Sequence, residues 1–205
     1  MSINLHIYPS AMINESRIFK HAKFLSKNYN FKKIILLGFW KKGLLKKELH
    51  QDNIIIKRVS FFRVKNRAIL YFYYYIYILI FIIFKKPKLI NVHSLEFLPI
   101  TLITKILKLK IVYEPHELET EKMGLSNFRK KISKFIEYLF IKKVDRLFVV
   151  GEKISNWYAA TYKIPKPPVI LNSSIITELK NSNYLREKYG LREDQLIILY
   201  QGNLE

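Results

Sequence analysis

The chain has 205 residues, half of them hydrophobic, no cysteine, and a net charge of +20 from 36 basic and 16 acidic side chains. This composition excludes a disordered chain, a disulfide framework and any thiolate metal site, and it fits a reducing cytoplasm. The positive charge favours anionic partners, namely nucleic acid, an anionic membrane surface or phosphorylated substrates. The first ten residues read as a strand and lack the features of a secretory signal.

Short apolar runs alternate with amphipathic stretches along the chain. The first part predicts strands at 3–8, 33–37 and 54–59, with helices at 15–27 and 41–49. The later part predicts strands at 89–92, 110–113, 145–150 and 168–171, with helices at 95–107, 127–141 and 152–162. We expect Ile132, Phe135, Ile136 and Leu139 to form the inward face of the helix at 127–141. This alternation predicts an α/β fold with a doubly wound, Rossmann-like parallel sheet, followed by a polar linker at 172–183.

The run from 68 to 84, AILYFYYYIYILIFIIF, has three possible interpretations. As a helix it would be about 25 Å long, short of the ~30 Å hydrocarbon core of a bilayer. Its tyrosines also prefer the membrane interface to the bilayer interior, which disfavours a transmembrane span. The alternatives are a helix between two strands whose surplus apolar face is available to a membrane, and a wholly buried helix.

Polar side chains follow two neighbouring strands at the point where each strand ends. His93 and Glu96 come after the strand at 89–92, and Glu114, His116 and Glu117 come after the strand at 110–113. Ligands of open α/β sheets bind beyond the carboxyl ends of the strands, so we expect both histidines in one crevice. Adjacent residues of an extended segment point to opposite sides, so one of His116 and Glu117 should face that crevice directly.

Five segments, in this order and spacing, resemble the family 4 glycosyltransferases with the two-domain GT-B fold, in particular bacterial members that build surface polysaccharides. The segments are YPSAMINESRIFKHAKFLSK (8–27), INVHSLEFLP (90–99), VYEPHELETE (112–121), VDRLFVVGEKISNWYAATYKI (144–164) and LREKYGLREDQLIILYQGNLE (185–205). The resemblance implies that 1–175 form the N-terminal acceptor-binding domain. Residues 176–205 would then be a linker, the strand 196–200 and the turn 201–204 that begin a truncated donor-binding domain.

The resemblance also implies the activity, which is retaining transfer of a sugar from a nucleotide-sugar donor to a membrane-linked glycan or lipid acceptor. The enzyme would work without a cofactor or a catalytic metal, on the cytoplasmic face of the cell membrane as a peripheral protein. Because most of the donor domain is missing, we expect no transfer by these 205 residues alone. A separate chain could supply that domain.

Each candidate site residue has a functional and a structural interpretation. His116 matches the family's recurrent histidine, which implies contact with the donor sugar near its anomeric centre; otherwise it caps a turn. Glu117 is the second catalytic candidate, and the substrate-binding candidates are His93, Glu96, Glu114, Ser10 and Asn14. The glutamates could instead be solvated loop carboxylates, and Ser94 could cap the following helix. The other acids and histidines of these segments, Glu119, Glu121, His6, His21 and His50, are expected to be structural.

Two other classes of protein fit the charge and the apolar run. One is a non-enzymatic Rossmann-like module that binds anionic membrane or nucleic acid, although specific nucleic-acid binding is not expected because no known nucleic-acid-binding motif accompanies the charge. The other is a membrane subunit that uses 68–84 as a span. The loop at 9–14 lacks the glycines that let a backbone approach a phosphate closely.

Overall fold

The computed structural model describes residues 2–60, 66–122, 124–173 and 182–200 and divides the chain into two units, Met1–Asn172 and Ser173–Glu205. Most of the expected linker and the expected turn at 201–204 lie outside the described residues. The second unit contains helix α6 (Tyr184–Tyr189), and residues 196–200 form no strand. The strand predicted there is wrong, because a strand needs a neighbour to share its hydrogen bonds and the described part of this unit offers none. Its assignment to a donor domain stays a prediction.

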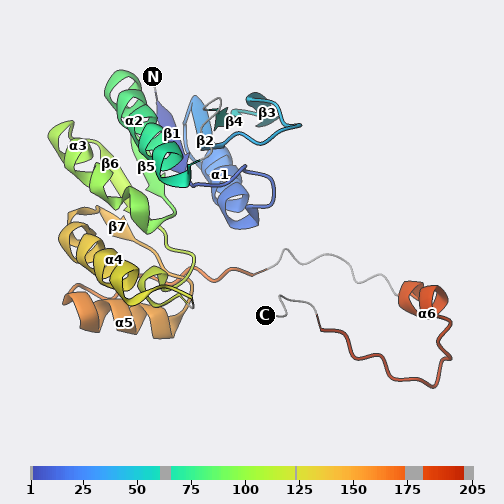
Figure 1. Ribbon diagram of the computed structural model, residues 1–205. Coiled ribbons are helices and arrows are strands. Elements are labelled where there is room, and N and C mark those ends of the chain that lie inside the picture. The colour runs from blue at the N-terminus through green and yellow to red at the C-terminus, as the bar shows by residue number, and fades with distance from the viewer. Residues whose placement is uncertain (1, 61–65, 123, 174–181, 201–205) are drawn as a thin grey trace. The chain divides into compact units, whose positions relative to one another are not determined.

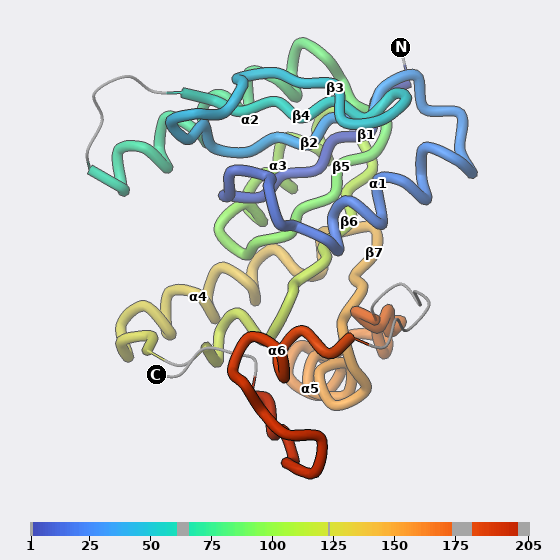
Figure 2. Tube along the Cα trace, turned by 90° about the vertical axis from the view of Figure 1, so that its right-hand side faces the viewer, coloured from blue at the N-terminus to red at the C-terminus, as the bar shows by residue number. Residues whose placement is uncertain are grey.

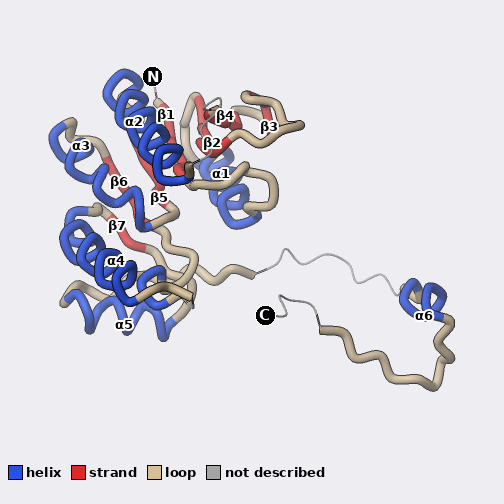
Figure 3. Tube along the Cα trace, in the orientation of Figure 1, coloured by secondary structure: helices blue, strands red, loops and turns tan. Residues whose placement is uncertain are grey.

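The first unit is built on a seven-stranded sheet in the order β3-β4-β2-β1-β5-β6-β7 (Figures 1 and 3). The strands are β1 (Ile3–Ile7), β2 (Lys33–Phe39), β3 (Lys47–Gln51), β4 (Ile54–Val59), β5 (Leu89–Val92), β6 (Lys110–Tyr113) and β7 (Arg146–Leu147). All neighbouring pairs are parallel except β3 with β4. The predicted Rossmann-like fold is confirmed, with an antiparallel strand added at one edge.

Helices cover both faces of this sheet (Figure 2). The helices of this unit are α1 (Ser16–Asn28), α2 (Arg67–Lys85), η1 (Leu95–Ile100), α3 (Thr101–Ile106), η2 (Glu119–Glu121), α4 (Asn127–Phe140), η3 (Ile141–Lys143) and α5 (Glu152–Tyr162). Apolar residues of α1 pack on β2 and β4, while a larger apolar cluster joins β1, β5 and β6 to α2 and η1. Because side chains alternate along a strand, the two faces of β2 and of β4 contribute to different clusters.

Helix α2 covers the sheet with one side and leaves the other side exposed. Asn66 caps its first turn by accepting from the Ala68 amide, and the buried Tyr74 hydroxyl donates to the Leu37 carbonyl at 2.8 Å. Phe72 and Ile80 are 61% and 50% exposed, so a wholly buried helix is excluded. Among the described helices, α2 is the one with the length and apolar composition to cross a membrane, while its buried side packs on this sheet.

Several predicted elements differ from the structure. The predicted helix at 41–49 is replaced by a turn and β3, which extends the sheet beside β4. The helix at 95–107 is divided into η1 and α3, because Pro99 lies inside the first part and cannot donate a backbone hydrogen bond. The strand at 145–150 is shortened to β7, and the strand at 168–171 is reduced to one bridge between Val149 and Val169.

The inward face of α4 was predicted correctly only in part, because Ile136 is partly buried and packs against the core whereas the other three predicted residues are exposed. Phe135 is 61% exposed and Ile132 is 42% exposed, whereas the acidic Glu137 is completely buried. Three tyrosine hydroxyls donate to the Glu137 carboxylate, from Tyr113 (3.2 Å), Tyr158 (2.7 Å) and Tyr162 (2.5 Å). Burial raises the pKa of Glu137, and the three hydrogen bonds oppose that rise. This carboxylate ties α4 to β6 and α5, so the helix is held by a polar contact that apolar periodicity cannot indicate.

Candidate functional site

The carboxyl ends of β1, β5 and β6 lie side by side, and the loops that follow them bring together aromatic rings. The His93 and His116 ring centres are 5.5 Å apart, and Tyr8 lies 5.0 Å from His116 and 6.4 Å from His93. Parallel pairing of β5 with both neighbours explains this meeting, because all three strands end at the same edge of the sheet. The structure therefore places the two predicted histidines together, as the strand pattern indicated.

A layer of buried polar side chains lies under this edge, between the sheet and α1. Asn4 donates its amide to the Asn91 side-chain oxygen at 2.7 Å, and Asn91 donates to Glu114 at 2.6 Å. His21, from the second turn of α1, contacts the other Glu114 oxygen at 2.5 Å. The strand register puts Asn4, Asn91 and Glu114 on the same face, because each occupies the alternate position from the apolar core residues. Hydrogen bonds thus replace apolar packing in this part of the contact between the sheet and α1.

A second chain of contacts joins His6 to His93. The His6 Nδ1 and His93 Nε2 atoms are 2.9 Å apart, and both rings are fully buried. One of these two nitrogens must accept, so the two rings cannot both be protonated. Burial lowers the pKa of His6 to about 4 and that of His93 well below its usual value, although the nearby Glu114 opposes both shifts. At neutral pH this pair is therefore uncharged.

Glu114 is the negative centre of the layer. Burial opposes its ionisation, but the neighbouring His93 and the hydrogen bond from His21 outweigh this effect and lower the pKa of the carboxyl. The carboxylate is 3% exposed, and its contacts with His21 and Asn91 direct it into the protein. This predicted substrate-binding residue is thus occupied in holding α1 and β5, with its oxygens turned toward side chains of the same unit.

His116 lies at the surface of the layer and is partly buried. Burial and the nearby positive charge of Arg17 lower the pKa of His116 to about 4, so its imidazole is neutral at pH 7. A neutral ring offers one donor and one acceptor nitrogen. Its Nε2 atom is buried and has no hydrogen-bond partner among the described residues. The described residues therefore leave the hydrogen-bonding capacity of this nitrogen unused.

The loop after β6 carries two further carboxylates with different environments. Glu117 is 60% exposed on its side chain, and its carboxylate lies 3.1 Å from the Lys122 amine. Glu119 is buried and accepts from the Leu95 amide at 3.3 Å, and burial raises its pKa to about 7 although Lys122 opposes this shift. Of the two adjacent residues His116 and Glu117, the His116 side chain therefore faces the buried polar layer, and the Glu117 side chain faces the solvent. Glu121 binds Lys130 and Lys134 and has a structural role.

Three predicted substrate-binding residues of the neighbouring loops stay outside the buried layer. Glu96 is exposed and accepts from the Ser94 hydroxyl, which makes no capping bond to η1, so the predicted cap is wrong. Ser10 accepts from the Met12 amide at 3.1 Å, and this contact shapes the loop between β1 and α1. The Asn14 side chain is exposed. Glu96, Ser10 and Asn14 remain candidates for substrate contact by position alone.

The site includes four residues to which the sequence prediction assigned no functional role. They are His6, His21, Arg17 and Glu119. The four-residue spacing of Arg17 and His21 places both on one face of α1, which is the signal that could have found them. Among the described residues, no group of three or more histidines and carboxylates has a geometry suited to a metal ion.

The fold, but not the sequence, is similar to that of known proteins. No family model and no curated protein sequence matches the chain significantly. Sucrose-phosphate synthase from Thermosynechococcus elongatus superposes with a TM-score of 0.68 at 10% identity, over 95% of this chain and 54% of the synthase. Anabaena HepE, in complex with UDP and glucose, gives a TM-score of 0.59 at 14% identity, over 93% of this chain and 50% of HepE.

A plant enzyme extends this similarity. Phytolacca americana UGT2, complexed with UDP-2-fluoro-glucose and pterostilbene, gives a TM-score of 0.53 at 11% identity, over 91% of this chain and 56% of UGT2. The chain therefore spans about half the length of each of these proteins. At such low identity the likeness establishes the architecture, and the described chain has the Rossmann-like fold found in GT-B glycosyltransferases.

Proposed function

We propose that the chain is the acceptor-side part of a retaining glycosyltransferase that transfers a sugar from a nucleotide-sugar donor to a membrane-linked glycan or lipid. One observation carries this proposal, which is the unpartnered Nε2 of a neutral His116 at the carboxyl edge of the sheet. The fold supports it, because two of the similar structures, HepE and UGT2, contain UDP with glucose or a glucose analogue. The product would serve polysaccharide or glycolipid synthesis.

The chemistry assigned to the site is positioning and charge stabilisation. The His116 imidazole would contact the reacting sugar and stabilise charge that develops near its anomeric carbon. Tyr8 and His93 lie against or near the His116 ring and would hold its orientation, while Glu117 would accept a hydrogen bond from a substrate hydroxyl. We expect no catalytic metal, and the leaving diphosphate would be held mainly by the donor domain.

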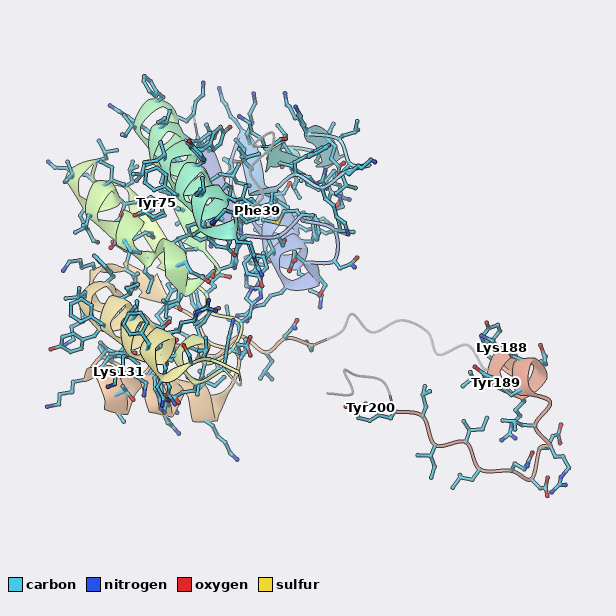
Figure 4. All side chains as sticks on the ribbon, viewed as in Figure 1. Phe39, Tyr75, Lys131, Lys188, Tyr189 and Tyr200 are labelled. Atoms are coloured by element: carbon cyan, nitrogen blue, oxygen red, sulfur yellow. The ribbon has the colours of Figure 1, made fainter. Side chains whose placement is uncertain are left out.

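The surface supports a location at an anionic membrane. Phe128, Ile132, Phe135 and Leu139 are exposed on α4 at spacings of four, three and four residues, so they form one apolar stripe. Basic residues flank this stripe, and Lys131 of this helix is exposed (Figure 4). An apolar stripe with lysine beside it is typical of a helix that lies on anionic lipid, so we propose peripheral attachment to the cytoplasmic face.

The activity is tested by measuring sugar transfer. The assay uses the protein translated from the whole reading frame that contains this chain. Labelled nucleotide sugars are incubated with a lipid extract, with and without EDTA, which we expect to have no effect. His116→Ala should reduce turnover by about 10² or more, the effect of losing one well-placed transition-state donor. The matched control is His50→Ala, because His50 lies on β3, where its ring contacts Phe19 with ring centres 4.5 Å apart, and it has no ring contact with His116 among the described residues. Equal turnover in the two variants would refute the role of His116.

Co-sedimentation with vesicles tests the location. The 205-residue chain should pellet with vesicles that contain phosphatidylglycerol and stay in solution with phosphatidylcholine alone. Phe135→Ser should weaken this binding without loss of stability, because Phe135 is 61% exposed. Binding to DNA that falls steeply with salt, without binding to vesicles, would instead favour the non-enzymatic nucleic-acid-binding module.

A further inference from the structure

A cavity of about 240 Å³ opens between the sheet and the last turn of α2, and its lining is part apolar and part basic. It lies toward the amino ends of β1 and β2, and Figure 1 shows the start of β1, marked N, beside the end of α2. Ile3 of the lining and Tyr8 of the candidate site are separated by five residues of extended chain, which is roughly 16 Å. The cavity is therefore separate from the candidate site at the carboxyl edge.

Ile3, Ile35, Ile55 and Phe81 form the apolar wall of this cavity. Three of them come from the neighbouring strands β1, β2 and β4, and the parallel register places Ile35 directly beside Ile55. Side chains alternate along a strand, so Ile35 lies on the α2 side of the sheet whereas Ile34 packs with α1. Ile55 is only partly buried, because α2 does not cover the sheet completely at β4. A strip of hydrocarbon is thus left open to a ligand.

Four lysine side chains surround this apolar wall, namely Lys33, Lys47, Lys57 and Lys85. Among the described residues, none of the four forms an ion pair with a carboxylate, and no acidic residue lines the cavity. The antiparallel register places Lys47 directly opposite Lys57. Like charges in this arrangement repel and destabilise the strand pair. The described chain thus concentrates positive charge around the cavity and supplies no carboxylate to balance it.

Two further contacts show how this charge is held. The Lys57 Nζ atom lies 5.3 Å from the ring centres of both Tyr77 and Phe81, so two aromatic rings of α2 keep the amine beside the apolar wall. Glu48 is adjacent to Lys47 in the sequence, but its carboxylate binds Arg58 at 3.0 Å on the other face of the sheet. An anion that enters from solvent would therefore meet lysine amines and hydrocarbon together.

We propose that this cavity binds a single-chain anionic lipid. Its alkyl chain would lie against the isoleucines and Phe81, and its carboxylate or phosphate head would bind the lysine amines, which act as flexible point charges. Inorganic phosphate would leave the apolar wall uncovered. A nucleic-acid base would find no platform on Phe81, which is 8% exposed. The inference goes beyond the proposed function, because it involves neither His116 nor sugar transfer, and it concerns a cavity and not the exposed stripe on α4.

Isothermal titration of the 205-residue chain with acetate, octanoate, decanoate and dodecanoate tests the proposal. We expect saturable binding of the three longer carboxylates, with an affinity that rises about two- to fourfold per added methylene until the cavity is filled, and no saturable binding of acetate. Decyltrimethylammonium has the same chain length as decanoate and the opposite charge, so it should bind at least about tenfold more weakly. Decyl phosphate compares the two head groups. Equal binding of the cationic and anionic ligands, or an affinity independent of chain length, would overturn the proposal.

A double variant, Lys47→Met with Lys57→Met, tests the role of the lysines. It should weaken decanoate binding by about tenfold, because each solvent-accessible lysine–anion pair contributes up to about fivefold. Methionine keeps an apolar side chain of similar length. The matched control is Lys41→Met with Lys42→Met, which removes two exposed positive charges between β2 and β3, outside the cavity lining, and should bind decanoate like the wild type. Equal affinities of the two double variants would contradict the proposal.

Further variants separate binding from structure. Without ligand, the Lys47 and Lys57 double variant should be at least as stable in urea as the wild type, because it removes the repulsion between opposite lysines. Ile55→Phe leaves all four lysines in place and fills part of the cavity, so it should abolish the gain in affinity from longer chains. Phe135→Ser on α4 should bind decanoate like the wild type. The proposal is wrong if Ile55→Phe keeps the full dependence on chain length, or if Phe135→Ser loses decanoate binding.

Discussion

Glu119→Gln should flatten the pH dependence of folding stability between pH 4.5 and 7. The Glu119 side chain is 8% exposed, and burial raises its pKa from 4.5 to about 7 in the folded protein. A carboxyl with a raised pKa binds its proton more tightly in the folded state. Its contribution to stability is therefore fully present below the unfolded pKa and is lost as the pH rises through the folded pKa.

The expected size of the stability difference follows from the shift in the pKa of Glu119. From 4.5 to about 7 is about 2.5 pH units, which at about 1.36 kcal/mol per unit corresponds to about 3 kcal/mol. Glutamine stays neutral over this range and keeps an oxygen for the Leu95 amide, which lies 3.3 Å from the carboxylate. The variant should therefore match the wild type at pH 4 and exceed its stability at pH 8 by up to about 3 kcal/mol.

Urea unfolding followed by circular dichroism at pH 4, 6 and 8 measures this difference. Glu117→Gln is the control, because it removes one negative charge from the same loop at a side chain that is 60% exposed. This control separates the effect on stability of removing a negative charge from the effect of removing a buried carboxyl. Parallel stability curves for Glu119→Gln and the wild type would refute the reasoning, since the buried carboxyl would then ionise as easily as in the unfolded chain.

Two other substitutions test contacts in the fold, each by urea unfolding at pH 7. Glu137→Gln should cost about 1–3 kcal/mol, because the amide nitrogen replaces one of the oxygens that accept buried tyrosine hydroxyls, such as the one bound to Tyr162 at 2.5 Å. Gly38→Ala should cost about 1–3 kcal/mol by crowding, because an added Cβ would lie 2.3 Å from the Ser10 carbonyl oxygen. Gly151→Ala, where nothing lies within 4 Å, should leave the stability close to that of the wild type.

The sequence was most informative where a local pattern determines the structure. The bounds of α5 agree with the prediction, and β4 begins and ends where the apolar run does. His93 and His116 were placed together because two parallel strands must end at one edge of a sheet. These inferences need only the chain order and the period of the apolar residues.

Other features depend on partners that are distant in the sequence. His6 and His21 read as unremarkable strand and helix residues, and their roles arise from contacts with His93 and Glu114, more than 80 residues away. Glu137 likewise looks like a solvated helix acid until the tyrosines of β6 and α5 surround it. Apolar spacing alone therefore placed Ile136 correctly but assigned the exposed Ile132, Phe135 and Leu139 to the core and missed Glu137.

The added antiparallel strand has a consequence for self-association. An unpaired sheet edge is a template on which another chain can add a strand. β3 occupies this edge with exposed polar and charged side chains such as Lys47 and His50, and a register shift between Leu49 and Gln51 breaks its regular pairing. At the other end the sheet tapers through the two residues of β7 to a single bridge. Both ends of the sheet thus oppose edge-to-edge aggregation, even though the chain is half hydrophobic.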